Sequence, residues 1–195
     1  MNKTITLAAC LLLATGALAD QHQAPEMSAE EKAMMDAMMA AATPGEPHKR
    51  LAQSVGKYKA TMHSWGHPGA EPVVTEMKVE REMQLGGRVL AEVWTGDFMG
   101  SPFNGYSRTG YDNQKKRYWT TWTDNMSTGL FIAYGEWDDK GRLVFHGDAA
   151  DPVTGDAIPT RSTVTYMDDG SEAMEMHQSQ DGQEYKSMAF VLTRQ

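Results

Sequence analysis

The feature that most constrains this chain is a series of short runs with a two-residue hydrophobic period, joined by turns rich in glycine and aspartate. In residues 73–83, apolar side chains such as Met77 and Val79 alternate with charged ones such as Lys78 and Glu80. This alternation is typical of a strand with one buried and one wet face. About ten such runs follow at roughly 8–12-residue spacing: residues 58–65, 73–83, 88–95, 103–110, 117–122, 130–137, 142–147, 159–167, 172–178 and 184–193.

Hairpin turns without helical crossovers predict an antiparallel meander. Such a sheet either closes into a barrel or stacks as a sandwich, and closure removes both exposed edges. We therefore predict an all-β fold, an up-and-down barrel of about ten strands preceded by short helices. A barrel of about this size can hold one small ligand.

The first nineteen residues have the pattern of a secretory signal peptide. Lys3 precedes an apolar run over residues 5–13, and Ala17-Leu18-Ala19 forms a small-x-small cleavage pattern before Asp20. The alternative is a lipoprotein signal with Cys10 as the lipidated residue, but the apolar segment before Cys10 is too short for it. The sequence therefore favours a periplasmic or secreted protein cleaved after Ala19, with no transmembrane helix in the mature chain.

Charge and cysteine content exclude several classes of function. The formal net charge is -8, which argues against nucleic-acid binding, because that needs clustered basic residues. The one cysteine excludes an intramolecular disulfide framework and any multi-cysteine metal site. The six histidines are scattered, and the pair His63 and His67 straddles a turn, so we expect neither a metal nor a cofactor.

Residues 20–47 form a methionine-rich segment with a predicted helix over residues 29–42. Ser28 and Glu31 form a capping box, and Met34, Met35, Met38 and Met39 pair at i,i+4 spacing. Thioethers suit Cu(I), but no histidine or cysteine lies beside them. We favour an adaptable apolar face that packs on the domain or on a protein partner. A second short helix is predicted between Pro47 and Gly56.

Five motifs stand in order along the predicted strands: Leu-Gly-Gly-Arg at 85–88, Gly-Asp-Phe-Met-Gly-Ser-Pro-Phe-Asn-Gly at 96–105, Gly-Tyr-Asp-Asn at 110–113, Trp-Thr-Asp-Asn-Met-Ser-Thr-Gly at 122–129 and Asp-Pro-Val-Thr-Gly at 151–155. Together they resemble a bacterial family catalogued as a domain of unknown function (number fifteen seventy-nine), over about residues 48–194. The resemblance implies a lipocalin-like, calycin-type β-barrel, often behind a signal peptide. It implies no established activity, so no catalytic residue is transferred.

The predicted organisation is a signal peptide (1–19), the methionine-rich segment (20–47) and the barrel (48–195). Strand faces that mix aromatic, methionine and a few polar side chains suit the lining of a small-molecule cavity. Arg161 shares a face with Thr163 and Thr165, and we expect it to meet Asp124 or an anionic ligand group inside the barrel. The alternative is a solid core with structural ion pairs. The predicted lining is Arg88, Trp94, Trp122, Asp124, Met126, Arg161 and Met176.

These features favour an exported barrel that binds a small apolar or amphiphilic molecule. One alternative is an enzyme, isomerase-like or hydrolase-like, that uses the same cavity. Another is a protein-interaction module that presents the methionine-rich helix to a partner.

The first testable prediction concerns the mature N-terminus. Because Ala17-Leu18-Ala19 ends the apolar run, we expect exported protein to begin at Asp20. Intact-mass analysis of the exported protein measures this directly. A diacylated species beginning at Cys10 would establish the lipoprotein alternative instead.

Overall fold

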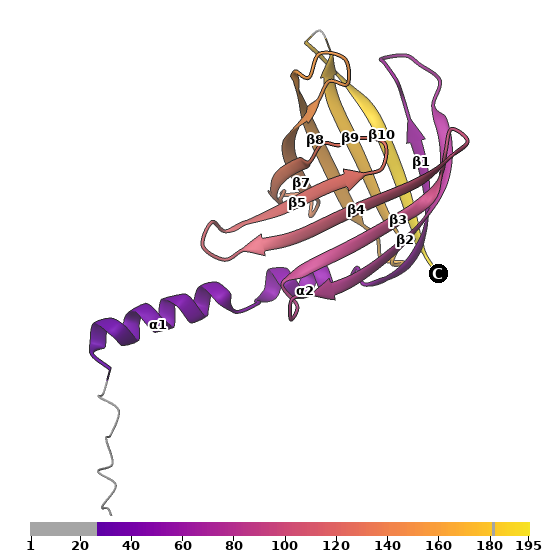
Figure 1. The fold of residues 1–195 in the computed structure, drawn as a ribbon. Coiled ribbons are helices and arrows are strands. Elements are labelled where there is room, and N and C mark those ends of the chain that lie inside the picture. The colour runs from indigo at the N-terminus through magenta and orange to yellow at the C-terminus, as the bar shows by residue number, and fades with distance from the viewer. Residues whose placement is uncertain (1–26, 181) are drawn as a thin grey trace, which may run out of the picture.

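The structure is a computed structural model that describes residues 27–180 and 182–195. It consists of two helices followed by a closed antiparallel barrel (Figure 1). The predicted signal peptide, its cleavage site and Cys10 lie outside the described residues. The strands are β1 (Gly56–Ser64), β2 (Val73–Gln84), β3 (Val89–Phe98), β4 (Ser101–Asp112), β5 (Arg117–Asp124), β6 (Phe131–Trp137), β7 (Leu143–Ala150), β8 (Ala157–Tyr166), β9 (Glu172–Gln180) and β10 (Gln183–Arg194).

Each strand pairs with its neighbours in the chain, and β1 pairs with β10 to close the barrel. The closing register runs from Tyr58 opposite Arg194 to Ser64 opposite Met188. The predicted ten-strand up-and-down barrel is therefore confirmed.

Strand β4 runs two residues further at each end than the predicted strand 103–110, and it continues through Gly105 as predicted. At Gly105, a Cβ atom would lie 2.5 Å from the Trp122 ring. The glycine therefore makes room for an aromatic ring on the backbone, a role that glycine often has within strands.

Inward side chains form two hydrophobic clusters. One includes Met77, Trp94 and Phe190, with partly buried methionines packed against it. The other includes Leu51 of the second helix together with Leu90 and Leu143 of the barrel wall. The barrel core and the second helix are thus one packed unit.

Helix α2 (Glu46–Ala52) covers one end of the barrel, which we call the closed end (Figure 1). Its Leu51 and His48 are buried, and His48 Nδ1 accepts a hydrogen bond from the Gly45 amide at 3.1 Å. Arg194, at the end of β10, donates to the carbonyl oxygens of Gln53 and Val55, both at 2.8 Å. The last strand therefore holds the segment that follows α2. The opposite end, where no helix of the described residues lies, is called the open end.

Helix α1 (Ala29–Ala42) extends away from the barrel (Figure 1). It begins with the predicted capping box, but none of its residues is buried. Only its C-terminal end is held: Asn113 Nδ2 donates to carbonyl oxygens of Ala40, Ala41 and Thr43, and Arg88 donates to Ala42 O. The expectation that the methionine face packs on the domain is wrong. Packing on a partner stays a prediction.

The second prediction concerns the pH dependence of the closed end. Burial lowers the pKa of His48, and its bond from Gly45 needs an unprotonated Nδ1. Unfolded His48, with a pKa of about 6.5, takes up a proton more readily. The unfolded state therefore binds more protons, so the free energy of unfolding decreases as the pH falls below about 6.5.

We expect His48→Gln, which keeps an acceptor for Gly45 but does not titrate in this range, to lose less stability than wild type between pH ~7.5 and ~5.5. Urea unfolding at both pH values measures the difference. His67→Gln, at an exposed turn residue, is the matched control and should behave as wild type. An unchanged pH dependence in His48→Gln would contradict the prediction.

Candidate functional site

A buried ionic network lies inside the barrel near the closed end. Arg81 of β2 is at its centre: Nε lies 2.8 Å from Glu92 Oε1, and Nη1 donates to Glu172 Oε2 at 2.7 Å. The three side chains are at most 12% exposed. An arginine so far from water needs close anionic partners to offset its desolvation, and β3 and β9 supply one each.

The surroundings of the network keep Arg81 charged and the nearby buried residue Tyr166 neutral. Burial alone would lower the pKa of Arg81, but Glu92 first and Glu172 second outweigh it and raise that pKa. Burial, followed by the charge of Glu172, raises the pKa of Tyr166. Arg81 and Tyr166 therefore keep their protons at neutral pH. This favours a network that fixes strands in place over one that exchanges protons with a substrate.

An aromatic cluster lies directly beside the ionic network. Glu92 connects the two, because its Oε2 accepts a hydrogen bond from Trp94 Nε1 at 3.1 Å. The Trp94 ring packs edge-on against Trp122 and Phe190, with centroids 5.9 and 5.5 Å apart. Trp122 in turn stacks on Phe103 at 6.3 Å. Edge-to-face and stacked pairs of this kind fix ring orientations.

Five apolar side chains pack against this cluster and remain partly exposed. We call them the mouth lining: Phe98, Trp122, Met174, Met176 and Met188, all packed against the cluster that contains Trp94. Met174 lies one inward position from Glu172 on β9, so this lining begins next to the ionic network.

The structure brings together four of the predicted lining residues. Trp94 is buried in the aromatic cluster, and Trp122 and Met176 belong to the mouth lining. Asp124 lies at the end of β5, where Oδ2 accepts from Trp122 Nε1 at 2.7 Å and Oδ1 accepts from the Met126 amide at 2.9 Å. Met126 itself is exposed in the β5–β6 loop rather than inside the barrel.

The expectation that Arg161 faces the barrel interior is wrong. On β8 the inward positions are Thr160, Ser162 and Val164, and Val164 packs on the core. Arg161 therefore lies on the outer wall, where its guanidinium contacts Glu184 at 3.0–3.2 Å. Arg161 does not meet Asp124. The hydroxyl residues around Arg161 could lie on either the inner or the outer face of the sheet. The pairing with β7 decides the face, because the core residues Leu143 and Phe145 lie opposite Val164 and Ser162.

Arg88 also lies away from the predicted interior. Gly86 and Gly87 both have positive φ, and the Arg88 amide donates to Gln84 O, so Arg88 belongs to the turn before β3. Its side chain holds the end of α1 through Ala42 O, 3.0 Å from Nε.

Sequence reasoning missed Arg81, Glu92 and Glu172. The signal was present: Arg81 has the same parity as Met77 and Val79, and Glu92 lies between Leu90 and Trp94. A charged residue at an apolar-face position is expensive to bury alone. Three of them on separate strands could have predicted an internal ion cluster.

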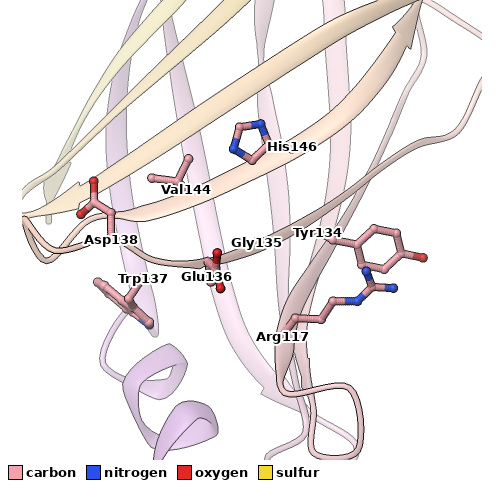
Figure 2. Close-up of a pocket in the computed structure, with 8 residues that line it drawn as sticks. All are labelled: Arg117, Tyr134, Gly135, Glu136, Trp137, Asp138, Val144 and His146. Atoms are coloured by element: carbon pink, nitrogen blue, oxygen red, sulfur yellow. The ribbon is translucent and has the colours of Figure 1, made fainter.

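Two hollows lie on the outer wall of the barrel. The first, of about 390 Å³, lies over β5 to β7 between Arg117, Tyr134 and His146 (Figure 2). In Figure 2 the Arg117 guanidinium lies over the Tyr134 ring, 3.7 Å from its centroid. The second, of about 460 Å³, includes His146, Arg161 and His177. These three are direct cross-strand neighbours. Both hollows are separate from the mouth lining.

Within residues 27–180 and 182–195, no group of three or more His, Cys, Asp or Glu side chains is arranged to hold a metal ion. In that same part of the chain, neither helix combines the length and apolar character needed to cross a membrane. The expectation that no metal is needed stays a prediction.

The third prediction tests the ionic network. Arg81→Met leaves two buried carboxylates without their cation, which costs about 3–5 kcal/mol when a buried pair is broken from one side. We expect a loss of this size in urea unfolding. The control is Arg161→Met, which removes an ion pair on the outer wall and should cost about 0–1 kcal/mol.

A further variant separates charge from packing. Arg81→Met combined with Glu92→Gln and Glu172→Gln should recover most of the lost stability, because no unpaired charge stays buried. Equal stability losses in Arg81→Met and Arg161→Met would contradict the importance of the network.

None of the curated proteins matches the chain in sequence. A family model described as Protein of unknown function (DUF1579) matches residues 43–194. This range begins just before α2 and includes all ten strands up to Arg194. Since it spans well over half of the sequence, the chain belongs to this family.

Proposed function

We propose that this protein is exported and binds a small, mainly apolar molecule inside the open end of its barrel. The observation that carries the proposal is the mouth lining. These apolar side chains are partly exposed, although they pack on the hydrophobic core. An apolar surface that keeps contact with water gains free energy when a ligand covers it.

The composition of the mouth lining suits an apolar ligand of variable shape. Three of its five members are methionines, whose unbranched thioether chains adapt to irregular surfaces. Trp122 and Phe98 add flat rings that give large contact areas. Such lining is favourable for a hydrocarbon or aromatic group and provides no fixed charge.

The ionic network supports a mainly apolar ligand over an anionic one. Arg81 already contacts two carboxylates, so it offers no free positive charge to a ligand carboxylate. Arg161, the anchor expected from the sequence, lies on the outer wall beside Glu184. Neither arginine is therefore available to an anionic group of a ligand inside the barrel, so the proposed ligand is held by apolar contacts.

Export rests on the sequence alone. Residues 1–19 have the basic start, apolar run and small-residue cleavage pattern of a signal peptide. A barrel that binds an apolar molecule outside the cytoplasm could carry it through an aqueous compartment where it dissolves poorly.

A second candidate function is attachment to a protein partner through α1. The observation in its favour is the exposure of Met34, Met35, Met38 and Met39 on a helix held to the barrel at only one end. Deletion of residues 28–42 would abolish such an interaction and leave ligand binding by the barrel unchanged.

The fourth prediction tests the mouth lining with the uncharged dye phenylnaphthylamine, which brightens in apolar surroundings. We expect saturable binding by the mature protein. Met176→Gln replaces a thioether by an amide that must be desolvated, so we expect the dye to bind about tenfold more weakly, which corresponds to about 1.4 kcal/mol.

The matched control is His177→Gln, at the next residue on the same strand but on the outer wall. It should bind the dye as wild type does. Circular dichroism confirms that both variants are folded. No saturable dye binding by the wild type, or equal weakening in both variants, would contradict the proposed function.

A further inference from the structure

Exposed apolar side chains are found at the tips of three loops around the open end. Met99 is in the β3–β4 hairpin, Met126 in the β5–β6 loop and Val153 in the β7–β8 loop. They are 78%, 54% and 90% exposed, respectively. We call these three residues the apolar tips. They lie on consecutive hairpins of the meander, so they follow one another around the opening.

An aspartate holds each of these loops in a defined conformation. Asp97 Oδ1 accepts from the Gly100 amide at 2.8 Å, next to Met99. Asp124 Oδ1 accepts from the Met126 amide at 2.9 Å, and Asp151 Oδ1 accepts from the Val153 amide at 2.8 Å. These hydrogen bonds fix the backbone of the turns that carry the apolar tips.

The described loops at the two ends of the barrel differ in their basic residues. The described connections at the open end are residues 65–72, 99–100, 125–130 and 151–156, and they contain no lysine or arginine. The connections at the closed end contain five basic residues (Arg88, Lys115, Lys116, Lys140 and Arg142) and four aspartates (Asp138, Asp139, Asp168 and Asp169). The described open-end loops therefore combine the apolar tips with acidic side chains alone, whereas the closed-end loops carry both signs of charge.

We propose that the open end docks on a lipid surface that carries no net negative charge. The separate tips are suited to this occupant, because each can enter the interfacial layer alone and needs no complementary pocket. The aspartates between them disfavour an anionic surface, where docking proteins use lysine and arginine.

Docking at this end would place the mouth lining against the lipid. The docked mouth lining would let the apolar ligand pass between lipid and barrel without crossing water, and this part of the inference rests on the proposed function. The docking itself depends only on the apolar tips and on the charge of the loops.

The experiment is flotation of the mature protein with vesicles. We expect it to float with phosphatidylcholine vesicles, and more weakly when about a third of the lipid is replaced by phosphatidylglycerol at low salt. Replacing the apolar tips together, as Met99→Asp, Met126→Asp and Val153→Asp, should weaken the apparent affinity for phosphatidylcholine vesicles at least tenfold. All three side chains are exposed, so the fold should survive, and circular dichroism checks this.

The control introduces two aspartates at the closed end, as Leu85→Asp with Met167→Asp, two exposed apolar residues of the β2–β3 and β8–β9 turns. It is compared with the double variant Met99→Asp with Val153→Asp, which adds the same charge at the open end. The closed-end variant should float as wild type does. The inference is overturned if the wild type does not float with phosphatidylcholine, if it prefers the anionic vesicles, or if the two double variants have the same effect.

Dye binding in the absence of vesicles separates this inference from the proposed function. If the tip variant binds phenylnaphthylamine normally but no longer floats, both proposals are supported. If the wild type floats but binds no dye, lipid docking stands and the proposed function fails.

Discussion

The pairing of β1 with β10 is the constraint on which the rest of the structure depends. Only when Tyr58 lies opposite Arg194 does the meander become a closed surface with an inside and an outside. The same register brings Arg194 to the segment that follows α2, where it contacts Gln53 O, Val55 O and the Tyr58 hydroxyl. The register that closes the barrel therefore also places Arg194 where it holds the segment that follows α2 over one end of the barrel.

Closure also explains why a charged network can exist inside the barrel. Arg81, Glu92 and Glu172 come from β2, β3 and β9, and β9 is far from the other two in the sequence. In an open sheet, β2 and β9 would lie apart. In the closed barrel β2 pairs with β1 and β9 pairs with β10, so Glu92 and Glu172 reach the Arg81 guanidinium from different strands. The ion cluster is therefore a consequence of closure and also stabilises it.

The sequence predicted the number of strands, the order of the hairpins and the bounds of α1, because each depends on local patterns. It did not decide which face of a strand points inward where the pattern is mixed. Arg161 lies among the small hydroxyl residues Thr160, Ser162 and Thr163, which could occupy either face. Arg81, in contrast, has the same parity as the apolar residues of its strand. A single-residue change of parity moves a side chain from the core to the wall. The contacts of β8 with β7 and β9 settle its parity, and those contacts are not local.

The methionines illustrate a second limit of sequence reasoning. Met34 and Met38 on α1 and Met174 and Met176 on β9 both form apolar stripes. The first pair is exposed, and the second packs inside the barrel. Periodicity shows that the side chains share a face but not what covers that face. Tertiary contacts determine this: α1 is held only at its C-terminal end, whereas β9 is paired on both edges.

The difference between the closed end and the open end of the barrel determines how a ligand would enter. At the closed end, Leu51 of α2 packs into the core. The ionic network also lies near this end, and its side chains bond to one another inside the barrel. Passage there would require breaking a buried ion cluster. At the open end the obstacles are methionine side chains, which change rotamer at little cost. For a ligand bound as proposed, the open end is therefore the route that leaves the buried ion pairs of the closed end intact.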